Sequence, residues 1–186
     1  MKAPDILDGN YEASAMVRRF APKMTDGAAG EVILDVACGS GRNAIQVARF
    51  GCHVLCIDND LTQFQKYLRM SDSARTDEGA LLTLCELDLI KEPWPFAPNS
   101  VGGIINVHFF LPSLFPHFKQ SLRPNGYFLF ESEPGCGGNY LQLPKAGQVR
   151  SALGNGFMFD YYRERRVGPA QYDAVSVKLF AKRVSS

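Results

Sequence analysis

The chain has 186 residues, of which 46% are hydrophobic and 21% charged, and its formal net charge is +1. This length and composition are typical of one soluble domain with a single core, so we expect one domain over residues 1–186. The near-zero charge argues against nucleic acid or an anionic membrane as a partner, and no apolar run is long enough to span a bilayer.

Helical spacing of Ala13, Met16, Val17 and Phe20 predicts an amphipathic N-terminal helix, within a cap segment of residues 1–28 that precedes a core of residues 29–186. Strand-like runs then alternate with helical ones. Strands are expected over 31–37, 52–58 and 81–88, with a helix over 42–50 that stops at Gly51 and a second helix that carries Leu61, Phe64 and Leu68. A fourth strand over 101–110, a proline-broken helix over 111–126 that ends at a turn, and a fifth strand over 127–132 follow.

The central runs are continuously apolar, as in parallel strands covered by helices on both faces. Residues 174–182 instead alternate between apolar and more polar side chains, which predicts a strand near or at a sheet edge. Together with residues 157–165 it would form a closing antiparallel hairpin. The expected fold is therefore α/β and Rossmann-like, a doubly wound seven-stranded sheet that is mostly parallel.

A glycine turn follows the first expected strand in "ILDVACGSGRN", residues 33–43. Gly39 and Gly41 let the backbone turn sharply and approach a ligand closely. Asp58 ends the second strand seventeen residues after Gly41, the usual spacing for an acid that binds a ribose diol. Asp88 ends the third strand, where a carboxylate can accept a hydrogen bond from an adenine amino group. These residues predict a ligand that contains a nucleoside.

Two nucleoside ligands compete. Residues 39–44 satisfy G-x-G-x-x-A, so an NAD(P)-dependent oxidoreductase is an alternative. Asp35 argues against it, because a carboxylate beside the turn would repel a diphosphate. S-adenosylmethionine has no phosphate and offers an ammonium and a sulfonium instead. A turn cap is the other role open to Asp35, and a helix or turn cap the other role open to Asp88.

With three acids at the ends of successive strands, the chain resembles the class I S-adenosylmethionine-dependent methyltransferases from about residue 10 to the C-terminus. The family's first motif appears as "DVACGSG", with Ala37 in place of the first glycine, and "LRPNGYFLF" resembles its turn and fifth strand. "CGSGRNAIQVA" is most similar to the small tellurite-resistance and thiopurine methyltransferases. Gly102 and Gly103 stand where the family commonly carries an acid.

The resemblance implies S-adenosylmethionine as the cofactor, S-adenosylhomocysteine as the product and a small molecule as the methyl acceptor. A non-catalytic S-adenosylmethionine-binding protein is a further alternative. By position, Asp35, Gly39 and Gly41 would hold the methionine moiety, Asp58 the ribose and Asp88 the adenine. The expected cofactor-binding residues are Asp35, Ala37, Cys38, Gly39, Gly41, Asn43, Asp58, Asn59, Asp88, Leu89 and Asn106. No metal site is expected.

His108, at the end of the fourth strand, is the expected contact with the acceptor, although a satisfied structural histidine fits the same position. The glycine-rich loop within residues 133–148 is either a lid over the acceptor or an ordinary loop, and Tyr11 on the cap segment is a further candidate contact. The cysteines form no C-x-x-C pair, which favours reduced core thiols of a cytoplasmic protein. We expect a monomer or a homodimer. They are Cys38, Cys52, Cys56, Cys85 and Cys136.

Overall fold

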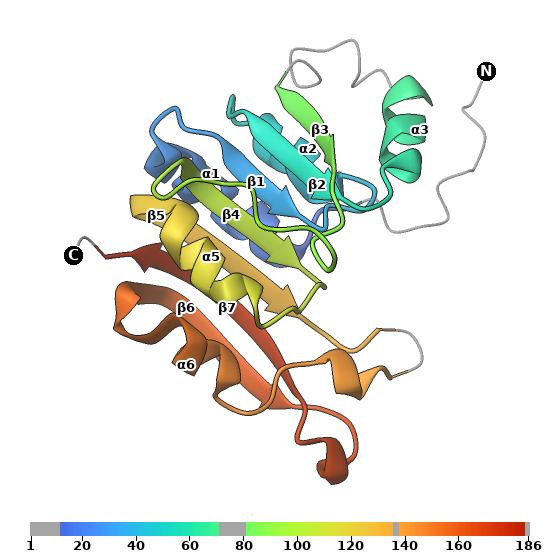
Figure 1. The fold of residues 1–186 in the computed structure, drawn as a ribbon, viewed down its shortest axis with the longest axis vertical. Helices are drawn as coiled ribbons and strands as arrows, with labels where there is room; N and C mark the ends of the chain where they lie inside the picture. Colours follow the sequence, from blue (N-terminus) through green and yellow to red (C-terminus); the bar gives the residue numbers. More distant parts are fainter. Residues whose placement is uncertain (1–11, 71–80, 136–137, 185–186) are drawn as a thin grey trace.

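The computed structural model describes residues 12–70, 81–135 and 138–184, so Tyr11 and Cys136 lie outside the described residues. These residues form a seven-stranded sheet of order β3-β2-β1-β4-β5-β7-β6 (Figure 1). The strands are β1 (Ile33–Val36), β2 (Val54–Asp58), β3 (Leu82–Glu86), β4 (Val101–Val107), β5 (Leu122–Ser132), β6 (Phe157–Arg166) and β7 (Val175–Arg183). Strands β1 to β5 are parallel, and β7 and β6 close the sheet as an antiparallel hairpin. The predicted fold class is confirmed.

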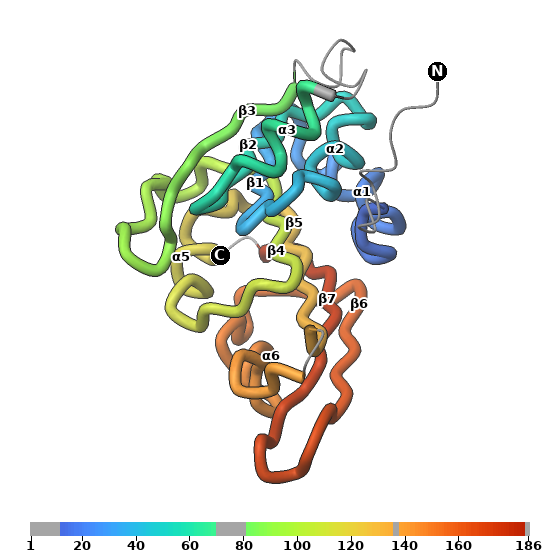
Figure 2. The backbone as a smooth tube through the Cα atoms, turned by 90° about the vertical axis from the view of Figure 1, so that its right-hand side faces the viewer, coloured from blue at the N-terminus to red at the C-terminus, as the bar shows by residue number. Residues whose placement is uncertain are grey.

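Helices cover both faces of this sheet (Figure 2). On one face lie α1 (Ala15–Ala28), α2 (Arg42–Ala48) and α3 (Thr62–Met70), which share a core that includes Val17, Val47 and Phe64. On the other face lie α5 (Leu114–Ser121) and α6 (Gln148–Leu153), whose core includes Phe115, Phe118 and Val149. Short 3₁₀ turns connect the later elements: η2 (Tyr140–Gln142), η3 (Gly154–Gly156) and η4 (Ala170–Tyr172). Within the described ranges, no helix combines the length and apolar character that a membrane crossing requires.

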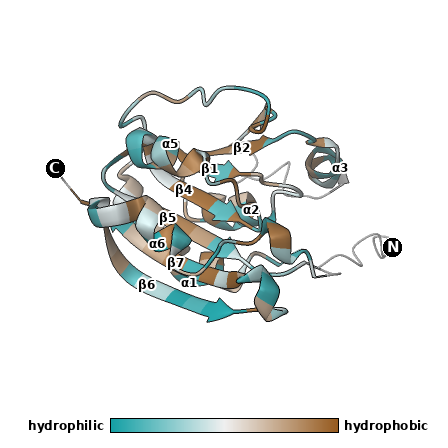
Figure 3. Cartoon of the chain, turned by 60° about the horizontal axis from the view of Figure 1, so that its bottom comes forward, coloured by the Kyte–Doolittle hydropathy of each residue, from teal (hydrophilic) through white to brown (hydrophobic). Residues whose placement is uncertain are grey.

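The burial of each strand follows its place in the sheet. All residues of β1 and β4 are buried, because helices cover both of their faces. The two outer strands are wetter: β3 is only partly buried, and much of β6 is coloured as hydrophilic in Figure 3. Continuous apolar runs in the sequence therefore identified the central strands correctly.

The last strand lies near the edge of the sheet, as predicted, but not at it. It lies between β5 and β6, and β6 forms the edge instead. The face of β7 expected to be wetter is covered by α1, because Phe180 stacks between Tyr127, at 4.6 Å, and Phe20, at 4.4 Å. A helix from the start of the chain thus buries a face that the local pattern marks as polar.

Strand β5 also begins earlier than expected, at Leu122. The turn predicted before this strand lies within it as a local irregularity. Asn125 has a φ of 66°, and the pairing of β5 with β4 shifts register between Val101 and Gly103. The preceding helix α5 is correspondingly short, and its Pro116 lies in the first turn, where proline is tolerated.

The glycines of β4 allow α1 to pack closely on the sheet. A Cβ at Gly102 would lie 2.8 Å from the Cα of Ala28, the last residue of α1. A side chain as large as a carboxylate therefore has no room there. The acid that the resemblance leads one to expect in this region is replaced by a helix–sheet contact.

The order of the strands creates a crevice beside β1. The chain runs outward from β1 through β2 to β3 and then returns to place β4 on the other side of β1. In such sheets the connections after β1 and β4 leave in opposite directions, and ligands bind beyond the carboxyl ends of the strands at that point.

Candidate functional site

A cavity of about 480 Å³ opens beyond the carboxyl ends of the parallel strands. Its walls come from four connections: residues 37–40, 42 and 43 after β1, 57–59 at the end of β2, 87–90 after β3 and 107–109 at the end of β4. The predicted site residues on these walls are Ala37, Cys38, Gly39, Asn43, Asp58, Asn59, Asp88, Leu89 and His108. Residues scattered over seventy positions of the sequence are thus brought together at one edge of the sheet.

The backbone of the glycine turn is left-handed at three positions. The φ angles are 55° at Ala37, 53° at Gly39 and 76° at Gly41. Ala37, which replaces the family's first glycine, therefore adopts a conformation that costs a residue with a Cβ about 1 kcal/mol. The replacement retains the loop path but at the expense of local strain.

The two glycines of the turn serve different purposes. A Cβ at Gly39 would meet nothing within 4 Å, and this residue lies on the cavity wall. A Cβ at Gly41 would instead lie 2.1 Å from the ring of Phe64, and Gly41 is not on the wall. Gly41 is therefore needed for packing against α3, while Gly39 leaves room for close approach to a ligand.

Asp35 lies beneath the turn and not on the cavity wall. It is 1% exposed, and its Oδ2 has no hydrogen-bond partner. Burial raises the pKa of its carboxyl from 3.8 to about 7, with a smaller contribution from the charge of Asp58. The backbone N–H of Ala44 and the charge of Arg42 act in the opposite direction. A buried, incompletely paired carboxyl behind the loop is suited to a ligand that brings positive charge to this end of the cavity.

Asp58 links the second strand to the glycine turn. Its Oδ2 accepts the backbone N–H of Gly39 at 2.8 Å, and its Oδ1 accepts the N–H of Asp60 at 3.1 Å. Each carboxylate oxygen has a second lone pair, so both can accept a further hydrogen bond. Asp58 and its neighbour Asn59 lie on the wall, where such acceptors suit the hydroxyls of a ribose.

Asp88 lies on the wall, two residues after the end of β3, but its carboxylate is engaged locally. It accepts the N–H of Ile90 at 3.0 Å and pairs with the Lys91 ammonium at 2.8 Å. These contacts, the one with Lys91 first, lower the pKa of Asp88. The turn-cap role is therefore present in the structure, and the adenine role stays a prediction.

Apolar side chains surround that turn. Leu87, Leu89 and Ile90 lie on the same wall, and Ile90 is 70% exposed. We had not predicted Ile90 as a site residue, although an exposed isoleucine directly after a polar turn is a recognisable signal. Asn106, by contrast, is buried within the sheet, where its Nδ2 donates to the carbonyl of Val36 at 3.4 Å, and it does not reach the cavity.

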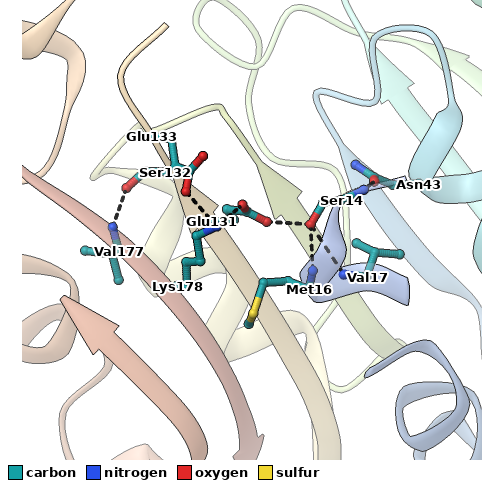
Figure 4. Close-up of polar contacts among 9 residues, drawn as sticks. All are labelled: Ser14, Met16, Val17, Asn43, Glu131, Ser132, Glu133, Val177 and Lys178. Atoms are coloured by element: carbon teal, nitrogen blue, oxygen red, sulfur yellow. Dashed lines mark hydrogen bonds and ion pairs between the residues drawn. The ribbon is translucent and has the colours of Figure 1, made fainter. Parts of the chain in front are cut away.

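The start of α1 fixes the orientation of Asn43. The backbone N–H of Ser14 donates to Asn43 Oδ1 at 3.0 Å (Figure 4). Because that oxygen accepts from the backbone, the amide nitrogen of Asn43 is the donor left for a ligand on the cavity wall. A donor at this position suits the carboxylate of an amino acid.

A buried acid, which we did not predict, lies on the other side of Ser14. The Ser14 hydroxyl donates to Glu131 Oε2 at 2.5 Å, and it also accepts the N–H groups of Met16 and Val17 as the cap of α1. Lys178 approaches Glu131 Oε1 to 2.9 Å and Glu133 Oε1 to 2.6 Å (Figure 4). An acid inside the apolar run "YFLFES" was the available sequence signal.

His108 connects two cavities. It follows β4 with a φ of 63°, and its backbone N–H donates to the carbonyl of Glu131 at 2.8 Å. It lines the large cavity and also a second one of about 260 Å³, which extends toward Ser132 and Glu133. Non-glycine residues with a left-handed backbone cluster at functional sites. Among the described residues, no group of three or more His, Cys, Asp or Glu side chains is placed to hold a metal ion.

The cysteines make no disulfide within the described ranges. Cys38, Cys52 and Cys56 are buried free thiols, and Cys85 is a half-buried one. Burial raises the pKa of Cys52, while Cys56 is held in its thiol form mainly by its contact with Cys38. Cys38 is the one of these four that reaches the large cavity.

Comparison with known proteins identifies both a family and a fold. Residues 33–126 match the family model described as a methyltransferase domain. No curated protein sequence matches the chain. Geranyl diphosphate C-methyltransferase from Streptomyces coelicolor A3(2), crystallised with Mg²⁺, geranyl diphosphate and S-adenosylhomocysteine, has a similar structure. Its TM-score is 0.64 at 14% identity, over 89% of this chain and 80% of that chain.

Two further solved structures are similar to this chain. TehB from Haemophilus influenzae has a TM-score of 0.65 at 14% identity, over 92% of this chain and 62% of that chain. The [4+2]-cyclase SpnF has a TM-score of 0.62 at 18% identity, over 96% of this chain and 86% of that chain. Identities this low establish a shared fold, and the cyclase shows that the fold alone does not determine the reaction.

Proposed function

Since the chain belongs to the methyltransferase-domain family, we propose that it transfers a methyl group from S-adenosylmethionine to a small molecule. The observation that carries this proposal is the acidic character of the large cavity. Asp58 and Asp88 lie on its wall with one arginine, Arg42, and the buried Asp35 lies behind the glycine turn with an unpaired oxygen. Such an environment favours a ligand with cationic groups and sugar hydroxyls over a diphosphate.

The walls divide into regions of different chemistry. Near the glycine turn, the Asn43 amide donor and the charge of Asp35 would hold the amino-acid end of S-adenosylmethionine. Asp58 and Asn59 would accept hydrogen bonds from the ribose. Leu89 and its apolar neighbours would pack against the adenine ring.

The reacting methyl group is supplied by the sulfonium of S-adenosylmethionine when that cofactor is bound. The chain's own contribution is to hold the acceptor in line, in a site sheltered from water, where alignment is worth up to ~7–11 kcal/mol. His108, on the wall that both cavities share, is the side chain we infer to contact the acceptor. The small size of the second cavity supports a small-molecule acceptor. Four thiols in mostly buried positions support a reducing, cytoplasmic location.

Calorimetry with S-adenosylhomocysteine tests the proposal. In Asp58→Asn the side chain retains one acceptor oxygen for Gly39 but loses the second, so affinity should fall about 10-fold or more. Asp60→Asn is the matched control, because it removes the same charge two residues away and retains the Oδ1 that caps α3 at Thr62. That variant should bind like the wild type.

NADH is titrated alongside. Binding of NADH without binding of S-adenosylhomocysteine would refute the methyltransferase proposal and support the oxidoreductase. Binding of S-adenosylhomocysteine with no methyl transfer to any acceptor in a broad panel would instead support a non-catalytic binding protein.

A further inference from the structure

The second cavity lies next to the proposed cofactor cavity and shares His108 with it. It extends from the ends of β4 and β5 to the turn η2, and its volume is about 260 Å³. The lining residues that matter for recognition are His108, Phe110, Ser132, Glu133, Asn139 and Gln142. A molecule placed there would lie beside the cofactor, which is the position required of a methyl acceptor.

The charges around this cavity do not balance. Glu133 is the one carboxylate among the described lining residues, and no lysine or arginine is among them. The nearby Lys178 ammonium is shared between Glu133, at 2.6 Å, and the buried Glu131, at 2.9 Å (Figure 4). In this cluster two carboxylates share one ammonium, and Glu133 is the carboxylate that reaches the described lining of the cavity.

The remaining polar groups of the lining are uncharged. Ser132 accepts the backbone N–H of Val177 at 3.2 Å, so its hydroxyl proton remains available as a donor. Asn139 and Gln142 add amide groups that can both donate and accept, and Phe110 offers an apolar ring surface. These groups can hydrogen-bond a polar molecule but supply no positive charge to balance an anionic one.

We propose that the second cavity binds the methyl acceptor and selects a small nitrogen compound, an amine or an N-heteroaromatic, over phosphorylated or carboxylated molecules. The inference rests on the proposed function, because it assigns the acceptor of the same reaction. It also separates this chain from the similar structure crystallised with geranyl diphosphate, whose ligand carries several negative charges. A diphosphate in this cavity would face Glu133, and the described lining supplies no lysine or arginine to bind it.

Transfer of the methyl group to such an acceptor forms one bond and breaks one. The nitrogen lone pair forms the new N–CH₃ bond as the S–CH₃ bond breaks, and sulfur retains that electron pair as a neutral thioether. An acceptor nitrogen that carries a proton must release it, and the His108 imidazole is the base on the wall that the two cavities share. The positive charge would thus move from the sulfonium toward the cavity that Glu133 lines.

Matched trios of probes test the charge preference. Tryptamine, tryptophol and indole-3-acetate share one ring and differ in charge, as do benzylamine, benzyl alcohol and benzoate. Each is titrated by calorimetry into the full chain saturated with S-adenosylhomocysteine. We expect the amine to bind about tenfold more tightly than the carboxylate, and this preference should shrink as salt is added.

Two variants link the preference to the cavity. Glu133→Gln should reduce the ratio between amine and carboxylate about fivefold, and Glu133→Lys should invert it. Glu31→Gln is the control, because Glu31 is exposed and precedes β1, at the opposite end of the sheet. It should leave the ratio unchanged.

Several results would overturn the inference. They are equal or tighter binding of the carboxylates, a ratio that Glu133→Lys does not change, or no binding of any probe. Failure of the proposed function is a separate outcome, since the chain would then not bind S-adenosylhomocysteine in the first step. If that step succeeds and the charge preference is absent, only the acceptor class is wrong.

Discussion

The buried carboxyl of Asp35 should make the stability of the chain depend on pH in a defined direction. Folding raises the pKa of this group from 3.8 to about 7, mainly because burial disfavours the charged form. Between those values the folded chain binds the proton more tightly than the unfolded chain does. The free energy of unfolding therefore falls as the pH rises from about 4 to about 7, and the loss is complete above the folded pKa.

The magnitude follows from the shift. A rise of about three pKa units at ~1.4 kcal/mol per unit costs the folded chain about 4 kcal/mol once Asp35 is fully charged. Of this, about 2.5 kcal/mol should be lost between pH 5 and pH 8. Asp35→Asn has no ionisable group at this position but retains an oxygen that can accept the Ala44 N–H. The free energy of unfolding of this variant should therefore lack the loss between pH 5 and pH 8.

Urea unfolding followed by circular dichroism at pH 5, 6, 7 and 8 measures the effect. The difference in unfolding free energy between wild type and Asp35→Asn should change by about 2.5 kcal/mol over this range. Other titrating groups are common to both proteins and cancel in the difference. Parallel stability curves for the two proteins would refute the reasoning, and the exposed Glu31→Gln should give a curve parallel to the wild type.

The same group links protonation to ligand binding. A cation near Asp35 lowers its pKa, so S-adenosylhomocysteine, whose amino-acid end carries an ammonium, should displace a proton from the wild type near pH 6.5. Calorimetry in buffers with different ionisation enthalpies counts that proton. The proton should not be released on binding to Asp35→Asn, and equal release from both proteins would show that Asp35 does not sense the ligand.

Two further predictions separate folding from binding. Gly41→Ala should lower the free energy of unfolding by about 2–3 kcal/mol, because it combines a left-handed backbone with a clash against Phe64. Gly39→Ala should lower it by only about 1 kcal/mol, because a Cβ there meets no neighbour. It should nevertheless weaken S-adenosylhomocysteine binding more than Gly41→Ala does. Unfolding midpoints and calorimetry on the same preparations check this, and equal stability losses would contradict it. Ser14→Ala should cost about 2–3 kcal/mol, since it removes both the helix cap and a donor to the buried Glu131. Ser14→Asp should destabilise the chain more than Ser14→Ala, because it places a second carboxylate beside Glu131, even though aspartate is a good helix cap. If urea unfolding ranks the two variants in the reverse order, the buried contact between Ser14 and Glu131 is wrong.

The sequence carries enough information to place the large cavity. Strands covered on both faces are continuously apolar, so β1 and β4 could be recognised without knowledge of their neighbours. Parallel strands end at one edge of the sheet, and therefore Gly39, Asp58 and Asp88 could be expected close together. These inferences depend on local pattern and on rules of chain topology, which a single sequence displays.

The local sequence pattern does not predict how deeply each acidic side chain is buried. Asp35 and Asp58 both lie in strands next to the glycine turn, yet the first is buried beneath the turn and the second lies on the wall. Strand β1 pairs with β2 so that Asp35 lies opposite Cys56, and Asp58 is therefore two residues nearer the carboxyl edge of the sheet. This register depends on the pairing of the strands, which no local pattern encodes. The second cavity could not be predicted for a similar reason, because His108, Ser132 and Gln142 come together only after β4 and β5 have paired and the chain has returned at η2.

The distribution of carboxylates around the two cavities is consistent with the charge that the proposed reaction moves. With S-adenosylmethionine bound as proposed, the positive charge would at first lie on sulfur, in the cavity flanked by Asp58 and the buried Asp35. Methyl transfer would carry that charge to the acceptor nitrogen, in the cavity that Glu133 lines. A site that presents fixed negative charge at both ends of this path need not reorganise while the charge moves, which is how preorganised electrostatics lower a barrier. For an anionic acceptor the same carboxylates would oppose binding at the second cavity, so the acidic walls favour one direction of charge flow and one class of acceptor together.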